Sequence, residues 1–147
     1  MTEYPDRKIE KCYHAGDTRD HRNHNIEVAL RGGSVRIGHG LNITQHIEIV
    51  PLCIKTCFEI CPIANIVAGG SARSDLRLST APILLGLGIP VSINPDDPGK
   101  FGYEDSTVDY FCAGVPFNWT LKHFKLIAIH SINHSICSEG VKIRMHK

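Results

Sequence analysis

Short apolar runs alternate with longer amphipathic segments along this chain. Four runs rich in apolar and β-branched residues are typical of strands, and glycine or proline closes each of them. These strand-like runs lie at residues 9–16, 34–40, 57–63 and 89–95. Segments with helix-like apolar spacing lie at 25–33, 45–56, 81–88, 106–114, 118–136 and 138–147. The order of the elements predicts strands that alternate with helices.

Residues 118–136 give the longest helical pattern. Apolar side chains such as Phe124 and Ile127 recur there at a spacing of about 3.6 residues, which places them on one face. Asn118 or Thr120 could cap the start of this helix, because both side chains can bond a free backbone amide.

Strands that alternate with helices pair in parallel, since each crossover helix returns the chain to the same end of the sheet. The predicted fold class is therefore α/β, with about four parallel strands and further helices near the C-terminus. In such folds, binding and catalytic side chains gather at the C-terminal ends of the strands. Candidate chemistry is therefore expected at that edge.

Composition limits the classes of function. The 147 residues suffice for one domain, and 42% hydrophobic with 21% charged residues is typical of a globular protein. A formal net charge of +1, with no basic cluster, gives no indication of nucleic-acid binding. No apolar run approaches the roughly 18 residues of a membrane span, and the polar N-terminus cannot serve as a signal peptide. We expect no nucleic-acid or membrane partner, and a cytoplasmic location unless a signal upstream of Met1 makes the protein extracellular.

Polar residues follow all four predicted strands. His14 and Asp17 come after the first strand, and His39 ends the second. Asp96 and Asp97 end the fourth. The third strand contains Glu59 and leads to Asn65, and we expect Glu59 to support its neighbours without direct chemistry. Because parallel strands end at the same rim, these side chains are expected to meet there.

Histidine and aspartate on different strands can share a zinc ion, which activates water for hydrolysis. His14 and Asp96 are the candidate ligands, and His39 and Asp17 could supply the base and the acid. A catalytic zinc needs at least three protein ligands, so this set is one short. The segment around Asp97 could also be a plain turn, because prolines flank the two aspartates.

Other metal sites were also considered. His130 and His134 stand at i and i+4 of a predicted helix, and His21 and His24 lie in a polar loop. Cysteines occur at positions 12, 53, 57, 61, 112 and 137 without a CxxC pair. Cys53, Cys57 and Cys61 have helical spacing, but the predicted strand interrupts it. We expect the cysteines to be reduced and mostly buried.

Four ordered motifs resemble those of the adenosine deaminase family, zinc aminohydrolases built on a TIM barrel. They are "HAGD", "RIGHG", "FEICPIAN" and "SINPDDP". The later segments "FGYEDSTVDYF" and "LKHFKLIAIHSINHSICSEG" are most similar to the growth-factor-related branch of that family. The resemblance implies the C-terminal half of a (β/α)8 barrel, strands five to eight, so that residues 1–147 form a partial adenosine deaminase-like domain.

The resemblance also implies a role for each site residue. His14 and Asp96 match zinc ligands, and His39 matches the histidine that orients and deprotonates the attacking water. Asp17 stands where the family has a glutamate that protonates purine N1, and Asp97 matches the aspartate that hydrogen-bonds N7. The implied reaction converts adenosine and water to inosine and ammonia, with one zinc ion.

One family motif is absent from the sequence. The H-x-H pair that supplies two further zinc ligands in the family does not occur in these 147 residues. The chain alone is therefore expected to be inactive and to need the N-terminal half of a barrel or a second copy. Half of a barrel would leave two unpaired strand edges, which favours association. Two other functions are alternatives to adenosine deamination. One is a non-catalytic remnant or binding module, and the other is a deaminase of AMP or another aminopurine.

Overall fold

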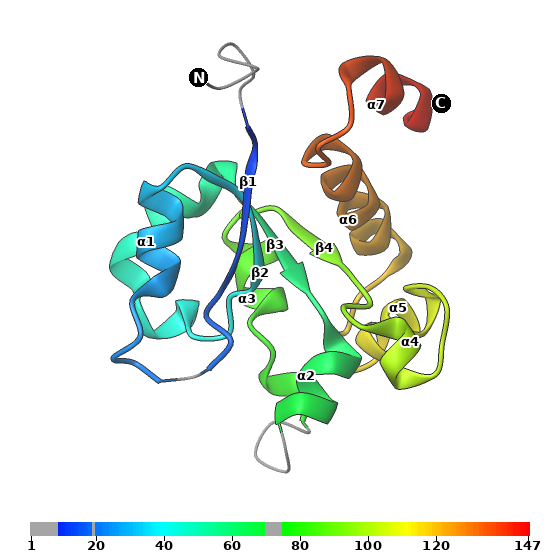
Figure 1. Ribbon diagram of the computed structural model, residues 1–147. Coiled ribbons are helices and arrows are strands. Elements are labelled where there is room, and N and C mark those ends of the chain that lie inside the picture. Colours follow the sequence, from blue (N-terminus) through cyan, green and yellow to red (C-terminus); the bar gives the residue numbers. More distant parts are fainter. Residues whose placement is uncertain (1–8, 19, 70–74) are drawn as a thin grey trace.

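The computed structural model describes residues 9–18, 20–69 and 75–147, and a four-stranded parallel sheet lies at its centre (Figure 1). The strands are β1 (Lys11–Ala15), β2 (Ser34–His39), β3 (Cys57–Ile60) and β4 (Val91–Ile93). Their order in the sheet follows the sequence, and all three pairings are parallel. This arrangement confirms the α/β class and the four strands predicted above.

Helices connect the strands and extend beyond β4. In chain order they are α1 (Asn25–Arg31), η1 (Ile43–Gln45), η2 (Ile47–Lys55), α2 (Pro62–Gly69), η4 (Leu76–Leu78), α3 (Ala81–Gly86), α4 (Pro98–Phe101), α5 (Thr107–Gly114), α6 (Leu121–Asn133) and α7 (Glu139–Met145). The segment predicted at 45–56 is 3-10 helix, with Pro51 inside it. Within the described residues, every helix is too short or too polar to cross a membrane.

The third strand is shorter than predicted. It ends at Ile60, and α2 begins at Pro62, where the sequence pattern gave a continuing strand. Proline is well placed in the first turn of a helix, because its missing amide proton has no intrahelical acceptor there. α2 is therefore an additional helix at the rim that the apolar pattern did not predict.

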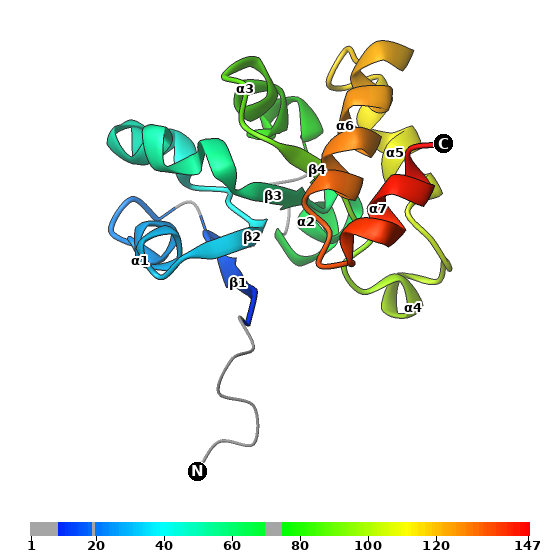
Figure 2. The same cartoon turned by 90° about the horizontal axis from the view of Figure 1, so that it is seen from above.

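The two faces of the sheet differ in polarity. Ile37, Phe58 and Val91 are fully buried on the face covered by helices such as α1 and α3 (Figure 2). On the opposite face, Arg36 bonds the Glu59 carboxylate at 2.6 Å and Ser92 Oγ at 3.2 Å. This polar face is satisfied internally, and Glu59 acts there as a support for its neighbours.

The two edges of the sheet also differ. Along β1, the first four of the five residues are exposed, whereas all three residues of β4 are buried. Helix α6 lies against β4, and the Val91 amide donates to His130 Nδ1 at 3.3 Å. β4 pairs with β3 alone, so it is an edge of the sheet as predicted, but α6 packs against it and His130 accepts from its Val91 amide.

Candidate active site

The five site residues predicted from sequence line one open cavity of about 360 Å³. It lies at the C-terminal edge of the sheet, and its other walls come from α2. The lining residues are His14, Asp17, His39, Ala64, Asn65, Ala68, Asp96 and Asp97. Side chains from three of the strand ends and one helix therefore face a common space.

His14 lies on the open edge strand. Its position in β1 is paired with Gly38 of β2, and a Cβ atom at Gly38 would touch the His14 ring at 3.4 Å. The glycine therefore leaves the ring room to lie across the neighbouring strand. His14 is exposed, because β1 is covered by a strand on one side only among the described residues.

His39 reaches the site through an unusual backbone conformation. Side chains alternate along a strand, so a regular β2 would direct His39 to the apolar face that Ile37 occupies. His39 instead has a φ of 70°, in the left-handed region. Its ring centroid then lies 4.8 Å from that of His14. Gly40 follows with a φ of 65°, and a Cβ atom there would clash with the Phe58 ring.

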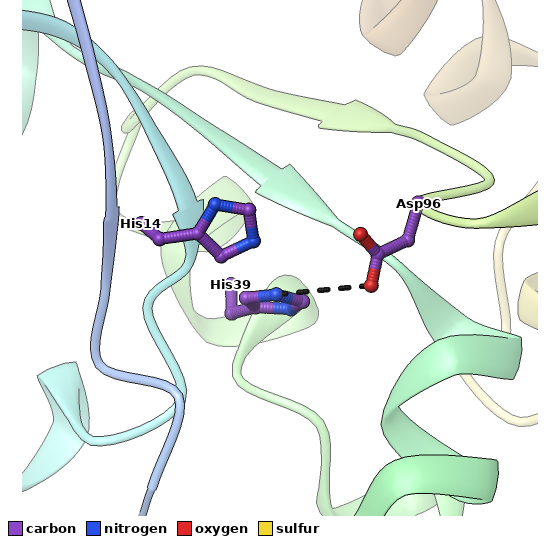
Figure 3. Close-up of side chains that lie close together, drawn as sticks. All are labelled: His14, His39 and Asp96. Atoms are coloured by element: carbon purple, nitrogen blue, oxygen red, sulfur yellow. Dashed lines mark ion pairs between the residues drawn. The ribbon is translucent and has the colours of Figure 1, made fainter.

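Asp96 is the second non-glycine site residue with a left-handed backbone, at a φ of 58°. Its Oδ2 lies 3.9 Å from His39 Nε2 (Figure 3). Ligand atoms of His14, His39 and Asp96 all lie within 4.8 Å of one another. Non-glycine residues in this region are strained and persist where surrounding contacts hold them, as is common at functional sites.

This trio fits a zinc ion by its chemistry. Two imidazole nitrogens and one carboxylate oxygen are donor types that zinc binds. In the described part of the chain, no other group of three histidine, cysteine or acidic residues converges in this way. His39, predicted as the residue that handles the water, would thus lie within reach of a water on a metal ion held by His14 and Asp96.

Asn65 has a contact that the sequence reasoning did not predict. Its Oδ1 lies 3.1 Å from His39 Nδ1. An amide oxygen only accepts hydrogen bonds, so the contact places the ring proton on Nδ1 and leaves the Nε2 lone pair facing Asp96. The motif that contains Asn65 marked the position, but nothing in the sequence indicated its partner.

Asp17 and Asp97 lie on the rim of the cavity and are exposed. Asp17 follows Gly16, whose φ of 75° forms the tight turn expected after β1. Asp97 precedes the first residue of α4, so the segment is a turn that leads into a helix. Both carboxylates are accessible from the cavity, where they can meet a bound molecule.

Among the described residues, none of the alternative sites brings three ligand atoms together. His130 Nδ1 is engaged by the Val91 amide, and His24 packs its ring against His46 at 4.7 Å. All six cysteines are free, and three are buried, one is half-buried and two are exposed. Burial raises the pKa of Cys53 and Cys57 to about 11, so these thiols are protonated near neutral pH and are poor metal ligands.

Comparison with known proteins points in the same direction as the site. A family model described as adenosine deaminase matches residues 4–147. Adenosine deaminase 2 of Dictyostelium discoideum is 36% identical over 135 residues, which cover 90% of this chain and 24% of that protein. Adenosine deaminase 2 of Sus scrofa is 32% identical over 92% of this chain and 28% of that protein. The chain thus spans about a quarter of the length of these curated relatives.

Solved structures show the same fold. Adenine deaminase from Arthrobacter aurescens superposes with a TM-score of 0.80 at 23% identity, over 93% of this chain and 41% of that one. The Arabidopsis N6-mAMP deaminase gives 0.78 at 19% identity, over 94% and 40%. An amidohydrolase from Burkhoderia ambifaria, solved with bound zinc, gives 0.75 at 19% identity over 94% and 38%. These neighbours have TIM-barrel folds, and the sheet described here corresponds to part of such a barrel.

Proposed function

Because this chain belongs to the adenosine deaminase family, we propose that it forms one wall of a zinc site that deaminates adenosine by hydrolysis. The observation that carries the proposal is the convergence of His14, His39 and Asp96 within 4.8 Å. Asp17 and Asp97 line the same cavity, so metal-binding and proton-transferring groups share one space.

Zinc bound by His14 and Asp96 would supply the Lewis acidity that activates water near neutral pH. His39 accepts the proton of the attacking water on Nε2, because Asn65 holds the other ring nitrogen. Asp17 would supply a proton to purine N1, and Asp97 would hydrogen-bond N7. The C6–O bond forms, His39 passes its proton to the exocyclic amino group, the bond from C6 to that group breaks, and ammonia leaves. The proton of the C6 hydroxyl returns to Asp17, which leaves the C6 carbonyl of inosine.

Adenosine is the first candidate substrate, since the two curated relatives reported above are adenosine deaminase 2 proteins. The names of the structural neighbours include an adenine deaminase and an N6-mAMP deaminase. AMP or another aminopurine is therefore the second candidate. Groups that contact the sugar or phosphate would distinguish these substrates, and none of the five site residues has that role.

A partner polypeptide is part of this proposal. The exposed edge of β1 borders a groove of about 350 Å³ whose lining includes Tyr13 and Val28. An added parallel strand would pair with β1 and place its apolar side chains in this groove. A second copy could pair in parallel with β1 only through its β4 edge, against which α6 packs, so we favour a complementary half-barrel as the partner. That partner would also bring the zinc ligands absent from this sequence.

A non-catalytic binding module is the competing function. It is favoured by the absence of an H-x-H pair and by Asp17, whose side chain is one methylene shorter than the family's glutamate. A displacement of about 1 Å can reduce a rate by on the order of 100-fold. Such a protein would keep the fold and the open cavity without turnover.

The test is a complementation assay. The chain is purified alone and after co-expression with the part of the Dictyostelium relative that the alignment leaves unmatched. Zinc content is measured by mass spectrometry, and ammonia release is measured from adenosine, AMP and adenine. Zinc-dependent turnover of adenosine in the complex, lost in His14→Ala, supports the proposal. A stable complex that neither holds zinc nor releases ammonia would leave the binding module as the better description.

A further inference from the structure

A buried carboxylate lies behind the site, outside the cavity. Asp109 of α5 is fully buried and uses its two oxygens on different partners. Oδ1 accepts from the Ile63 amide at 3.1 Å, and Oδ2 lies 2.9 Å from the Tyr103 hydroxyl. The same hydroxyl lies 3.0 Å from the Pro95 carbonyl oxygen. Asp109 and Tyr103 therefore connect three separate segments of the chain.

Both connections lead to the rim of the cavity. Ile63 is in the first turn of α2, two residues before Asn65, whose amide oxygen bonds His39. Pro95 immediately precedes Asp96, the strained member of the trio. Asp109 and Tyr103 thus fix two segments. One is α2, whose Asn65 orients His39, and the other is the turn that carries Asp96.

We propose that Asp109 and Tyr103 are positioning residues for the His14, His39 and Asp96 site. The pair touches neither the trio nor the cavity, and it acts by holding α2 and the 94–97 turn in register with each other. A left-handed Asp96 persists only where its surroundings hold it, and the bond to Pro95 is a contact of that kind. The metal-binding part of the inference rests on the proposed function, whereas the structural part does not.

The test compares two tyrosines that each lose only a hydroxyl group. Tyr103→Phe removes the link to Pro95 and Asp109. Tyr110→Phe is the matched control, because Tyr110 is also half-buried and its hydroxyl bonds Ser131 on α6, away from the rim. Tyr103→Phe loses two contacts and leaves the buried Asp109 Oδ2 without its partner, so it should lose more thermal stability than Tyr110→Phe, which loses one.

Two readouts separate positioning from general stability. In the metal-free chain, hydrogen exchange of the amides in 94–101 should accelerate in Tyr103→Phe and stay unchanged in Tyr110→Phe. The Co²⁺ dissociation constant should rise about tenfold in Tyr103→Phe alone, the effect typical of residues that support metal ligands. Equal exchange rates and equal Co²⁺ affinities in the two variants would overturn the inference.

A wild-type chain that binds no Co²⁺ would count against metal binding by His14 and Asp96 in the absence of the partner's ligands. The exchange comparison would then still decide whether Tyr103 holds the turn. Asp109→Asn provides a second variant, because an amide keeps one acceptor oxygen and replaces the other with a donor, so exchange should accelerate in at least one of the segments 62–65 and 94–101. Unchanged exchange in both segments of a folded Asp109→Asn protein would also contradict the proposal.

Discussion

His39 Nδ1 and Asn65 Oδ1 lie 3.1 Å apart, and this contact determines which ring nitrogen of His39 offers its lone pair to the site. With the proton fixed on Nδ1, the Nε2 lone pair points toward Asp96, 3.9 Å away. Asn65 lies on α2, a helix that the sequence pattern did not predict. It nevertheless sets the chemistry of His39, a site residue that the sequence did predict.

Replacement of Asn65 by leucine should change the tautomer of His39. Leucine has a similar volume and cannot accept a hydrogen bond, so the Nδ1-protonated form loses its partner. Asn65→Asp keeps an acceptor and should preserve the tautomer. Long-range ¹H–¹⁵N NMR of the histidine rings measures the two forms directly, and an identical His39 spectrum in both variants would show that the contact has no effect.

Zinc should stabilise the wild-type chain and leave ligand variants unaffected. A ligand that binds only the folded state adds about 2.7 kcal/mol at a concentration 100 times its dissociation constant. His14→Ala and Asp96→Asn should each abolish this gain. His24→Ala is the control, because His24 contacts His46 and lies outside the trio. Thermal unfolding with and without zinc is the measurement, and a zinc-dependent rise retained in both ligand variants would place the metal elsewhere.

Gly40→Ala should destabilise the fold more than Gly33→Ala. Both glycines have left-handed backbones, with φ of 65° and 80°, and a Cβ in that region costs about 1–2 kcal/mol. At Gly33 the added atom meets nothing within 4 Å, whereas at Gly40 it meets the buried Phe58 ring. Overpacking adds about 1–3 kcal/mol. Urea unfolding of the two variants should therefore differ by about that amount, and equal losses would contradict the packing described at Phe58.

Acid should weaken the contact between α6 and β4. Burial lowers the pKa of His130, and the Val91 amide needs an unprotonated Nδ1 as its acceptor. Burial lowers the pKa of His134 too, and His130, Arg36 and Lys142 lower it further. Because the folded pKa lies below the unfolded value of about 6.5, this contribution is present above that pH and is lost as pH falls.

The measurement is the free energy of unfolding between pH 7.5 and 5. Each histidine can change it by at most about 1.4 kcal/mol per pH unit. His130→Gln removes one titrating group, so its stability should fall less steeply with pH than that of the wild type. His146→Gln is the control, because His146 is exposed near the C-terminus. Parallel pH profiles for the wild type and His130→Gln would show that the ring does not titrate across this range.

The local pattern of apolar residues in the sequence was sufficient to predict the strands and most of the helices. Each strand has its own apolar run, and α6 begins after Thr120, one of the two predicted caps. At that end the Thr120 amide donates to His123 Nδ1 at 2.9 Å. Interactions over short sequence distances are visible in a sequence, so these elements could be predicted.

Contacts between distant residues explain what could not be predicted. The start of α2 is held by Asp109, 46 positions further along the chain. The direction of His39 depends on a backbone angle that opposes the alternation of its strand. The cover on β4 comes from His130, 39 positions away from Val91. The family motifs identified the residues of the site, but only the tertiary structure shows how their side chains are oriented.

The cover that α6 provides for β4 also limits how copies of this protein can assemble. An endless stack of strands requires every subunit to offer two complementary sides, one for the copy before it and one for the copy after it. This sheet offers only the β1 side, so growth by strand pairing ends after a single addition. Protein overproduced on its own should therefore collect as small complexes or amorphous precipitate, and not as filaments built by strand pairing.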